Sequence, residues 1–213
     1  DNGDQALFAG FQFLGTYTFS RQIEKVQFLN DSDPEPSKAI GFLWAPHRIT
    51  LSGVYELPFG AGKPFLKQAG VVDKLVGGWQ LSAIQTFQSG SALLLPDVLY
   101  TGVDPRLPPN ERSVTKWFNT AAFTVLPSFT LRNVSTRLAR LRGDAIVNYD
   151  LSLSKSVKLT ERLRLQLRGE AFNAFNRLQY GAPNLTPSSG SYGRITNQAN
   201  APRSIQLGAR LEF

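Results

Sequence analysis

The C-terminal stretch at residues 203–213, RSIQLGARLEF, alternates between apolar and polar residues. From Ile205 onward every second residue is apolar, and the residues between are Gln, Gly, Arg and Glu. A period of two predicts a β-strand with one apolar face and one polar face. A tilted strand needs about 9 to 11 residues to cross the hydrocarbon layer of a membrane. The stretch therefore fits a membrane-spanning strand, provided that other segments share its pattern.

Five further segments share this length and alternation: residues 6–19, 47–59, 77–89, 148–159 and 162–174. The chain also contains 15 Phe, 18 Gly and 13 Pro, a composition that favours strands and turns over helices. The sequence therefore predicts an all-β fold with six long strands.

Composition excludes several classes of protein. No run of about 18 apolar residues exists, which excludes a transmembrane helix. The absence of Cys excludes a disulfide scaffold and a thiolate metal site, and the single His47 is a weak basis for a metal site. The net charge of +7 comes from basic residues scattered along the chain, so we expect no nucleic-acid partner.

The connections between the predicted strands alternate in length. Long loops are expected at residues 20–46, 91–147 and 175–202, and short turns at residues 60–76 and 160–161. Long loops on one side and short turns on the other are typical of an antiparallel transmembrane β-barrel. If the C-terminus is periplasmic, all three long loops fall on the extracellular side.

Strand length and aromatic placement favour a membrane over water. Strands of soluble sandwiches usually have about five or six residues, and the predicted strands are about twice as long. Aromatic residues recur near the ends of the apolar faces, where membrane barrels place their interfacial aromatics. These residues are Tyr17, Phe19, Tyr55, Phe59, Trp79, Phe87 and Tyr149. A soluble β-sandwich remains the alternative on pattern alone.

Six strands are too few for a closed barrel, since single-chain barrels begin at about 8 and an open edge is costly in hydrocarbon. We therefore expect the chain to be part of a larger barrel, with further strands upstream or in partner chains. The start at Asp1, without a signal peptide, is interpreted as that of a fragment.

Six motifs occur in an order that resembles a known family. They are PHRITLSGVYELPFGAGKPF (46–65), GGWQLSAIQTFQSG (77–90), WFNTAAF (117–123), YDLSLSK (149–155), ERLRLQLRGEAFNAFN (161–176) and YGRI…PRSIQLGARLEF (192–213). Together they resemble the C-terminal part of TonB-dependent, Oar-like outer-membrane receptors, which carry an N-terminal carboxypeptidase-regulatory-like domain. One departure is LRGDAIVNYD at residues 141–150, where the family more often has an LRGPG-like stretch.

The resemblance implies a barrel of about 22 strands with a plug domain, of which this chain supplies about the last six strands. The plug and the TonB box would lie upstream and be absent here. The family's location is the outer membrane of Gram-negative bacteria, and its activity is transport energised by a TonB-type complex. Phe213, with Leu211, would be the assembly signal read by the barrel-assembly machinery.

Two groups of residues are candidate contacts for a solute. Charged residues on the polar face would line the lumen and contact the plug or an anionic solute: Arg48, Arg164, Arg168, Glu170 and Arg210. The alternative is a hydrated wall with cross-strand ion pairs, for example between Arg168 or Arg210 and Glu170. The loop aromatics Trp117, Phe118 and Phe123 would either contact a ligand or pin the long loop to itself.

Catalytic motifs are missing from the sequence. No Ser-His-Asp spacing and no phosphate-binding glycine loop occurs, so neither an enzyme nor a cofactor is expected. The leading hypothesis is a segment of an outer-membrane receptor that takes up a solute. The alternatives are a structural or adhesive surface protein without transport, and a soluble β binding domain.

Overall fold

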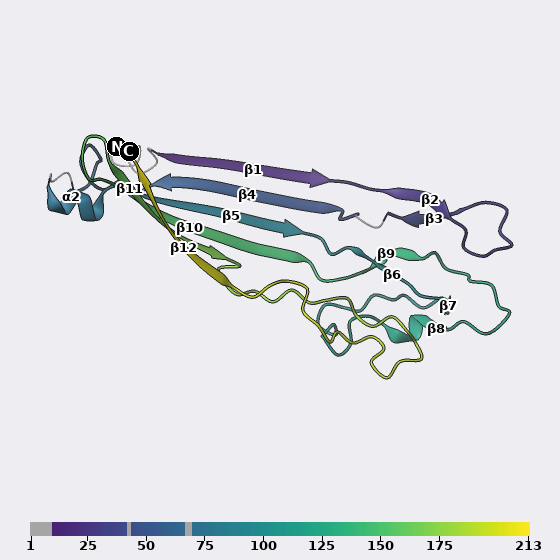
Figure 1. Ribbon diagram of the computed structural model, residues 1–213. Coiled ribbons are helices and arrows are strands. Elements are labelled where there is room, and N and C mark those ends of the chain that lie inside the picture. The colour runs from purple at the N-terminus through teal and green to yellow at the C-terminus, as the bar shows by residue number, and fades with distance from the viewer. Residues whose placement is uncertain (1–9, 42–43, 67–69) are drawn as a thin grey trace.

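A computed structural model describes residues 10–41, 44–66 and 70–213 and contains one long antiparallel sheet (Figure 1). Its six strands follow the chain order across the sheet: β1 (Phe11–Phe19), β4 (His47–Glu56), β5 (Trp79–Gln88), β10 (Ile146–Lys158), β11 (Arg164–Phe172) and β12 (Ser204–Glu212). Each overlaps one of the six predicted strands, and residues 6–9 of the first lie outside the described residues. The fold is all-β, as predicted.

The register gives the sheet two different faces. Residues paired across an antiparallel ladder lie on the same face, and one row across the sheet is Phe13, Gly53, Ala83, Leu151, Ala171 and Ile205. All odd-numbered residues of the six strands therefore share one face, here called the apolar face. The even-numbered residues share the other, the polar face. Every pairing keeps this parity, so the period of two in the sequence becomes a continuous two-sided sheet.

The two ends of the sheet differ in their connections (Figure 1). At the turn end, residues 57–78 join β4 to β5 and include α2 (Val71–Val76), and residues 159–163 join β10 to β11. At the opposite loop end lie the three long connections. Within the described residues, no helix has the length and apolar character to cross a membrane.

The long connections contain more structure than predicted. The connection from β1 to β4 holds the pair β2 (Ile23–Gln27) and β3 (Ser37–Ile40). The connection from β5 to β10 holds β6 (Ala92–Leu94) paired with β9 (Arg137–Arg142), β7 (Val98–Tyr100) paired with β8 (Phe123–Val125), and η1 (Thr120–Ala122). The segments expected as long loops at 20–46 and 91–147 therefore contain short strands, which the sequence does not reveal because they are too short to show alternation against the surrounding prolines.

The buried core of the described residues lies at the loop end. Its members are Leu93, Leu95, Val98, Trp117, Phe118, Ala122, Phe123, Val134 and Leu141, all from the connection between β5 and β10. The last long connection packs against them through Tyr180, Leu185, Tyr192 and Ile195. It also bonds to them through the backbone, since Trp117 N donates to Gly193 O at 2.8 Å. Residues 91–145 and 177–200 thus form one packed unit, here called the loop module.

The hairpin of β2 and β3 is fastened to the loop module by polar contacts. The guanidinium of Arg137 lies 2.9 Å from the carboxylate of Glu24, and both side chains are mostly buried. The hydroxyl of Ser135 donates to Lys38 O at 3.2 Å. All three long connections therefore meet at the loop end.

Candidate functional site

The charged residues expected in the lumen all lie on the polar face, but they do not form one cluster. Arg164, Arg168, Glu170 and Arg210 occupy the adjacent strands β11 and β12, whereas Arg48 lies on β4 at the loop end, with β5 and β10 between. Arg168 pairs with Glu170 at 3.1 Å, but along its own strand β11 and not across strands as expected. Such exposed pairs contribute at most about 1 kcal/mol.

The expected pairing of Arg210 with Glu170 is wrong. Arg210 instead lies 3.4 Å from Glu212 on its own strand. The register explains this, because Glu170 faces Gln206 across the ladder while Arg210 faces Gln166.

The predicted interfacial aromatics form two bands on the apolar face. The loop-end band contains Tyr17, Phe19, Phe87 and Tyr149, and the turn-end band contains Tyr55, Trp79 and Phe59. Phe11, which the sequence analysis did not single out, joins the turn-end band by packing edge-on against Tyr55. Two aromatic bands that flank an apolar zone are the arrangement of barrels in lipid.

The loop aromatics are buried in the loop module. Trp117, Phe118 and Phe123 all belong to its core, and Phe118 is only 1% exposed. Phe118 packs edge-on against Tyr192, whose hydroxyl donates to Phe123 O at 3.3 Å and whose pKa burial raises to about 12. Of the two alternatives, this burial fits the one in which the rings pin the loop to itself, while Trp117 and Phe118 also reach the wall of a cavity.

That cavity is the candidate site. It has a volume of about 220 Å³ and lies on the loop module, between the segment at residues 105–118 and strand β9. Its apolar walls come from Pro105, Leu107, Trp117, Phe118 and Leu141. Four arginines complete the lining: Arg106, Arg112, Arg140 and Arg142. We call it the basic pocket.

Arg142 is committed to the structure of the loop module. Its Nη1 donates to Gly90 O and its Nε to Ala139 O, each at 2.9 Å, while the guanidinium lies 4.2 Å from the ring centre of Trp44. Partial removal from water lowers the pKa of Arg142. Its donors are therefore already engaged with the protein.

Arg112 is held differently, by stacking. Its guanidinium lies 3.5 Å from the ring centre of Trp117, whose Nε1 is fixed in turn by donating to Arg142 O at 2.9 Å. Partial desolvation lowers the pKa of Arg112, and the carboxylate of Asp144 opposes this shift from a distance. In the described part of the chain no carboxylate lies within ion-pair distance of Arg112, so stacking fixes its position while its N–H donors stay available.

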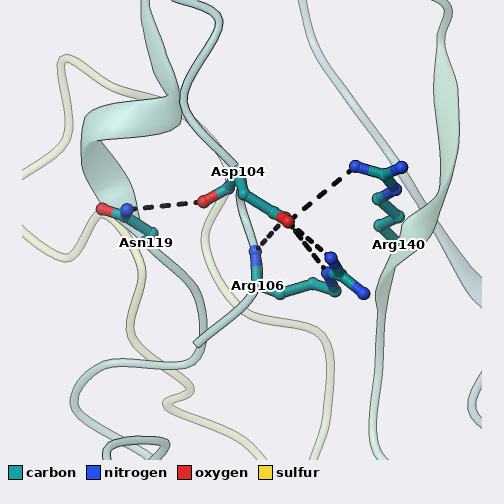
Figure 2. A network of polar contacts seen from close by, with 4 residues as sticks. All are labelled: Asp104, Arg106, Asn119 and Arg140. Carbon is teal, nitrogen blue, oxygen red and sulfur yellow. Dashed lines mark hydrogen bonds and ion pairs between the residues drawn. The ribbon is translucent and has the colours of Figure 1, made fainter. Parts of the chain in front are cut away.

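Asp104 supplies the counter-charge beside the pocket (Figure 2). Arg106 donates to its carboxylate through Nη2 at 2.6 Å and through its backbone N–H at 3.0 Å, and Arg140 lies 3.8 Å away. The hydrogen bond from the Arg106 side chain lowers the pKa of Asp104 to about 2, and the same contact raises the pKa of Arg106. Asn119 Nδ2 donates to Asp104 O at 3.4 Å and anchors the segment.

The pocket has four guanidinium groups, with the carboxylate of Asp104 beside them and that of Asp144 farther away, so it stays positive. It can attract a negatively charged group and offer N–H donors to it. Among the described residues no group of three or more acidic or histidine side chains is placed to hold a metal ion. The sequence analysis missed this site because its arginines are spread over two distant segments and carry no motif.

Comparison with known proteins identifies the family. Residues 3–206 match the model of the outer membrane beta barrel domain. No curated protein and no solved structure gives a significant match. The match covers nearly the whole chain and agrees with the two-faced sheet, the aromatic bands and the division into a turn end and a loop end. The location is therefore the bacterial outer membrane, and the chain belongs to the outer membrane beta barrel domain family.

Proposed function

We propose that the chain is a wall segment of a TonB-dependent outer-membrane receptor that captures a solute at the loop module and passes it through the barrel. The observation that carries this proposal is the position of the loop module. A packed unit with a cationic cavity lies at one end of the sheet, and the polar face of that sheet carries charged, amide or hydroxyl side chains at most of its positions. A polar inner wall is what a water-filled transport route requires.

The proposal includes further strands and a plug as partners. Strands β1 and β12 each have one neighbour within the described sheet, so their outer edges carry backbone groups without a strand partner. Such edges are costly in hydrocarbon, where no water can satisfy them. Additional strands would close the barrel, and a plug would contact the polar face near Arg164, Arg168 and Arg210. A stable, heat-modifiable monomer formed by residues 1–213 alone in detergent would refute this part.

Transport is tested by removing the protein from the outer membrane and measuring uptake of candidate solutes, with and without the proton-motive force. We expect one solute whose uptake depends both on the protein and on the force, because a TonB-type complex transmits that energy. A variant of the protein without residues 97–134 should lose uptake while still reaching the outer membrane, since it removes part of the loop module and keeps the six long strands.

A structural or adhesive surface protein makes the opposite prediction. In that case every solute enters equally with and without the protein, whatever the proton-motive force, and only attachment to surfaces or partners changes. Equal uptake under all conditions would therefore rule out the transport proposal.

A further inference from the structure

We propose that the basic pocket binds a small oxyanion, a phosphate or a carboxylate group, and that Asp104 occupies part of this site as an internal counter-anion until the ligand arrives. The biological role of this site, which is to capture a solute, rests on the proposed function. Binding itself is measured independently of transport.

The distribution of partners among the four arginines points to an anion. Arg142 donates hydrogen bonds to backbone oxygens, and Arg106 donates to the carboxylate of Asp104. Arg112 has an aromatic stack and no carboxylate within ion-pair distance among the described residues, and Arg140 has a single contact at 3.8 Å with a side chain that is 65% exposed. Two guanidinium groups therefore face the cavity with donors to spare. A planar guanidinium presents paired donors that match a carboxylate or a phosphate.

The size of the cavity limits the ligand. At about 220 Å³ it is smaller than the pockets of about 300–1,000 Å³ that hold drug-sized molecules. It has room for an oxyanion with a few attached atoms, and Trp117 and Phe118 give those atoms an apolar wall. A small phosphate or carboxylate solute fits this lining, and so does the phosphate of a membrane lipid headgroup.

Asp104 is placed to compete with that ligand. Its carboxylate already binds Arg106 with both oxygens, at 3.2 Å and 3.1 Å from Nε, and it is the acidic group nearest to Arg140 (Figure 2). An incoming anion therefore meets a site that is partly neutralised. Removing the charge of Asp104 should strengthen anion binding, which is the opposite of what loss of a ligand-contacting residue would do.

The test is calorimetric titration, in phosphate-free detergent, of the protein purified from the outer membrane together with the strands that complete its barrel. Inorganic phosphate and citrate are the free probes, and phosphatidic acid in mixed micelles is the lipid probe. We expect Arg112→Gln and Arg140→Gln each to weaken binding about tenfold or more, since each removes charged hydrogen bonds. Asp104→Asn should strengthen it several-fold. The matched control is Arg194→Gln, an exposed arginine elsewhere in the loop module, which should leave affinity unchanged.

The outcomes separate the possibilities. Binding of a free probe identifies a solute site, and binding of phosphatidic acid alone identifies a lipid site with the same chemistry. No binding of any probe, or equal weakening by Arg194→Gln, overturns the inference, and unchanged or weaker binding by Asp104→Asn overturns the role of Asp104. If the pocket binds phosphate but uptake never depends on the protein, the transport proposal fails and the binding site stands. If uptake depends on the protein but no probe binds, the binding inference fails alone.

Discussion

Lys155 and Trp79 are cross-strand neighbours on the apolar face, and the ammonium group of Lys155 lies 5.3 Å from the ring centre of Trp79. A charged side chain on a lipid-facing surface is costly. Here it is covered, since Lys155 is only 6% exposed. Its Nζ donates to Gly77 O, and Asp73 in α2 attracts it. The connection between β4 and β5 thus folds over the turn end of the apolar face and is pinned there by one lysine.

We expect Lys155→Met to loosen this connection. Met keeps most of the apolar stem but removes the donor to Gly77 O, and a buried carbonyl without its partner costs about 1–3 kcal/mol. The measurement is proteolysis of residues 60–78, together with urea unfolding in detergent. Lys158→Met is the matched control, because Lys158 is exposed on the polar face of the same strand and its loss should change stability by less than about 0.5 kcal/mol. If residues 60–78 were equally resistant to proteolysis in the two variants, Lys155 would not be the residue that holds this connection in place.

The two faces of β5 should respond oppositely to charge. Ala83 lies at mid-strand on the apolar face, and Ser82 beside it lies on the polar face. Arginine on the lipid face near the middle of the membrane costs about 2–4 kcal/mol in such barrels. We therefore expect Ala83→Arg to reduce assembly into the outer membrane, measured by fractionation and heat-modifiability, while Ser82→Arg assembles normally. The reverse result would mean that the apolar face is not the one in lipid.

The stability of the loop module should depend on its buried rings. Phe118→Ala removes a ring that is 1% exposed and is expected to cost about 3–5 kcal/mol of local stability. Phe129→Ala is the control, since Phe129 is fully exposed and its loss should be nearly neutral. Hydrogen exchange of the membrane-embedded protein measures both. We expect faster exchange across residues 91–145 in the first variant only, with the six long strands unchanged.

The faces of the sheet follow from the sequence because a strand shows its two faces locally, in a period of two. This period of two predicts all six long strands. The strand register then pairs residues that are far apart in the sequence, such as Leu151 and Ala83. Gln85 departs from the pattern, because this polar residue lies on the apolar face, between Leu51 and Tyr149. Nothing in the structure explains it.

The loop module could not be predicted in the same way. Its strands have three to six residues, which is too short for a readable period, and its core joins two connections that β10 and β11 separate in the chain. The basic pocket is harder still, since Arg112 and Arg140 are brought together by the packing of Trp117 and Leu141. The position of Lys155 is equally hard to predict from the sequence. A lysine is tolerated on the apolar face because the connection between β4 and β5 covers it.

Anion binding at the basic pocket should be insensitive to pH over the neutral range. The hydrogen bond from Arg106 lowers the pKa of Asp104 from 3.8 to about 2, so this carboxylate stays charged over that range. Because this folded-state pKa is below the unfolded value, the contact with Arg106 is at full strength above about pH 4 and is lost as the pH falls towards 2. Sulfate affinity should therefore be constant from about pH 5 to about pH 8.

Below about pH 3 the same reasoning predicts a rise in the affinity for methanesulfonate, a strong-acid anion that keeps its charge in acid, because protonation of Asp104 releases Arg106 to the ligand. Sulfate is the probe for the neutral range, where it keeps its double charge whereas phosphate changes its own, but sulfate takes up a proton in the same acid range as Asp104 and is replaced there. In Asp104→Asn the rise should be absent and the affinity high throughout, with tryptophan fluorescence confirming that each sample is folded. A sulfate affinity that changes between about pH 5 and about pH 8 would show that another titrating group controls the pocket.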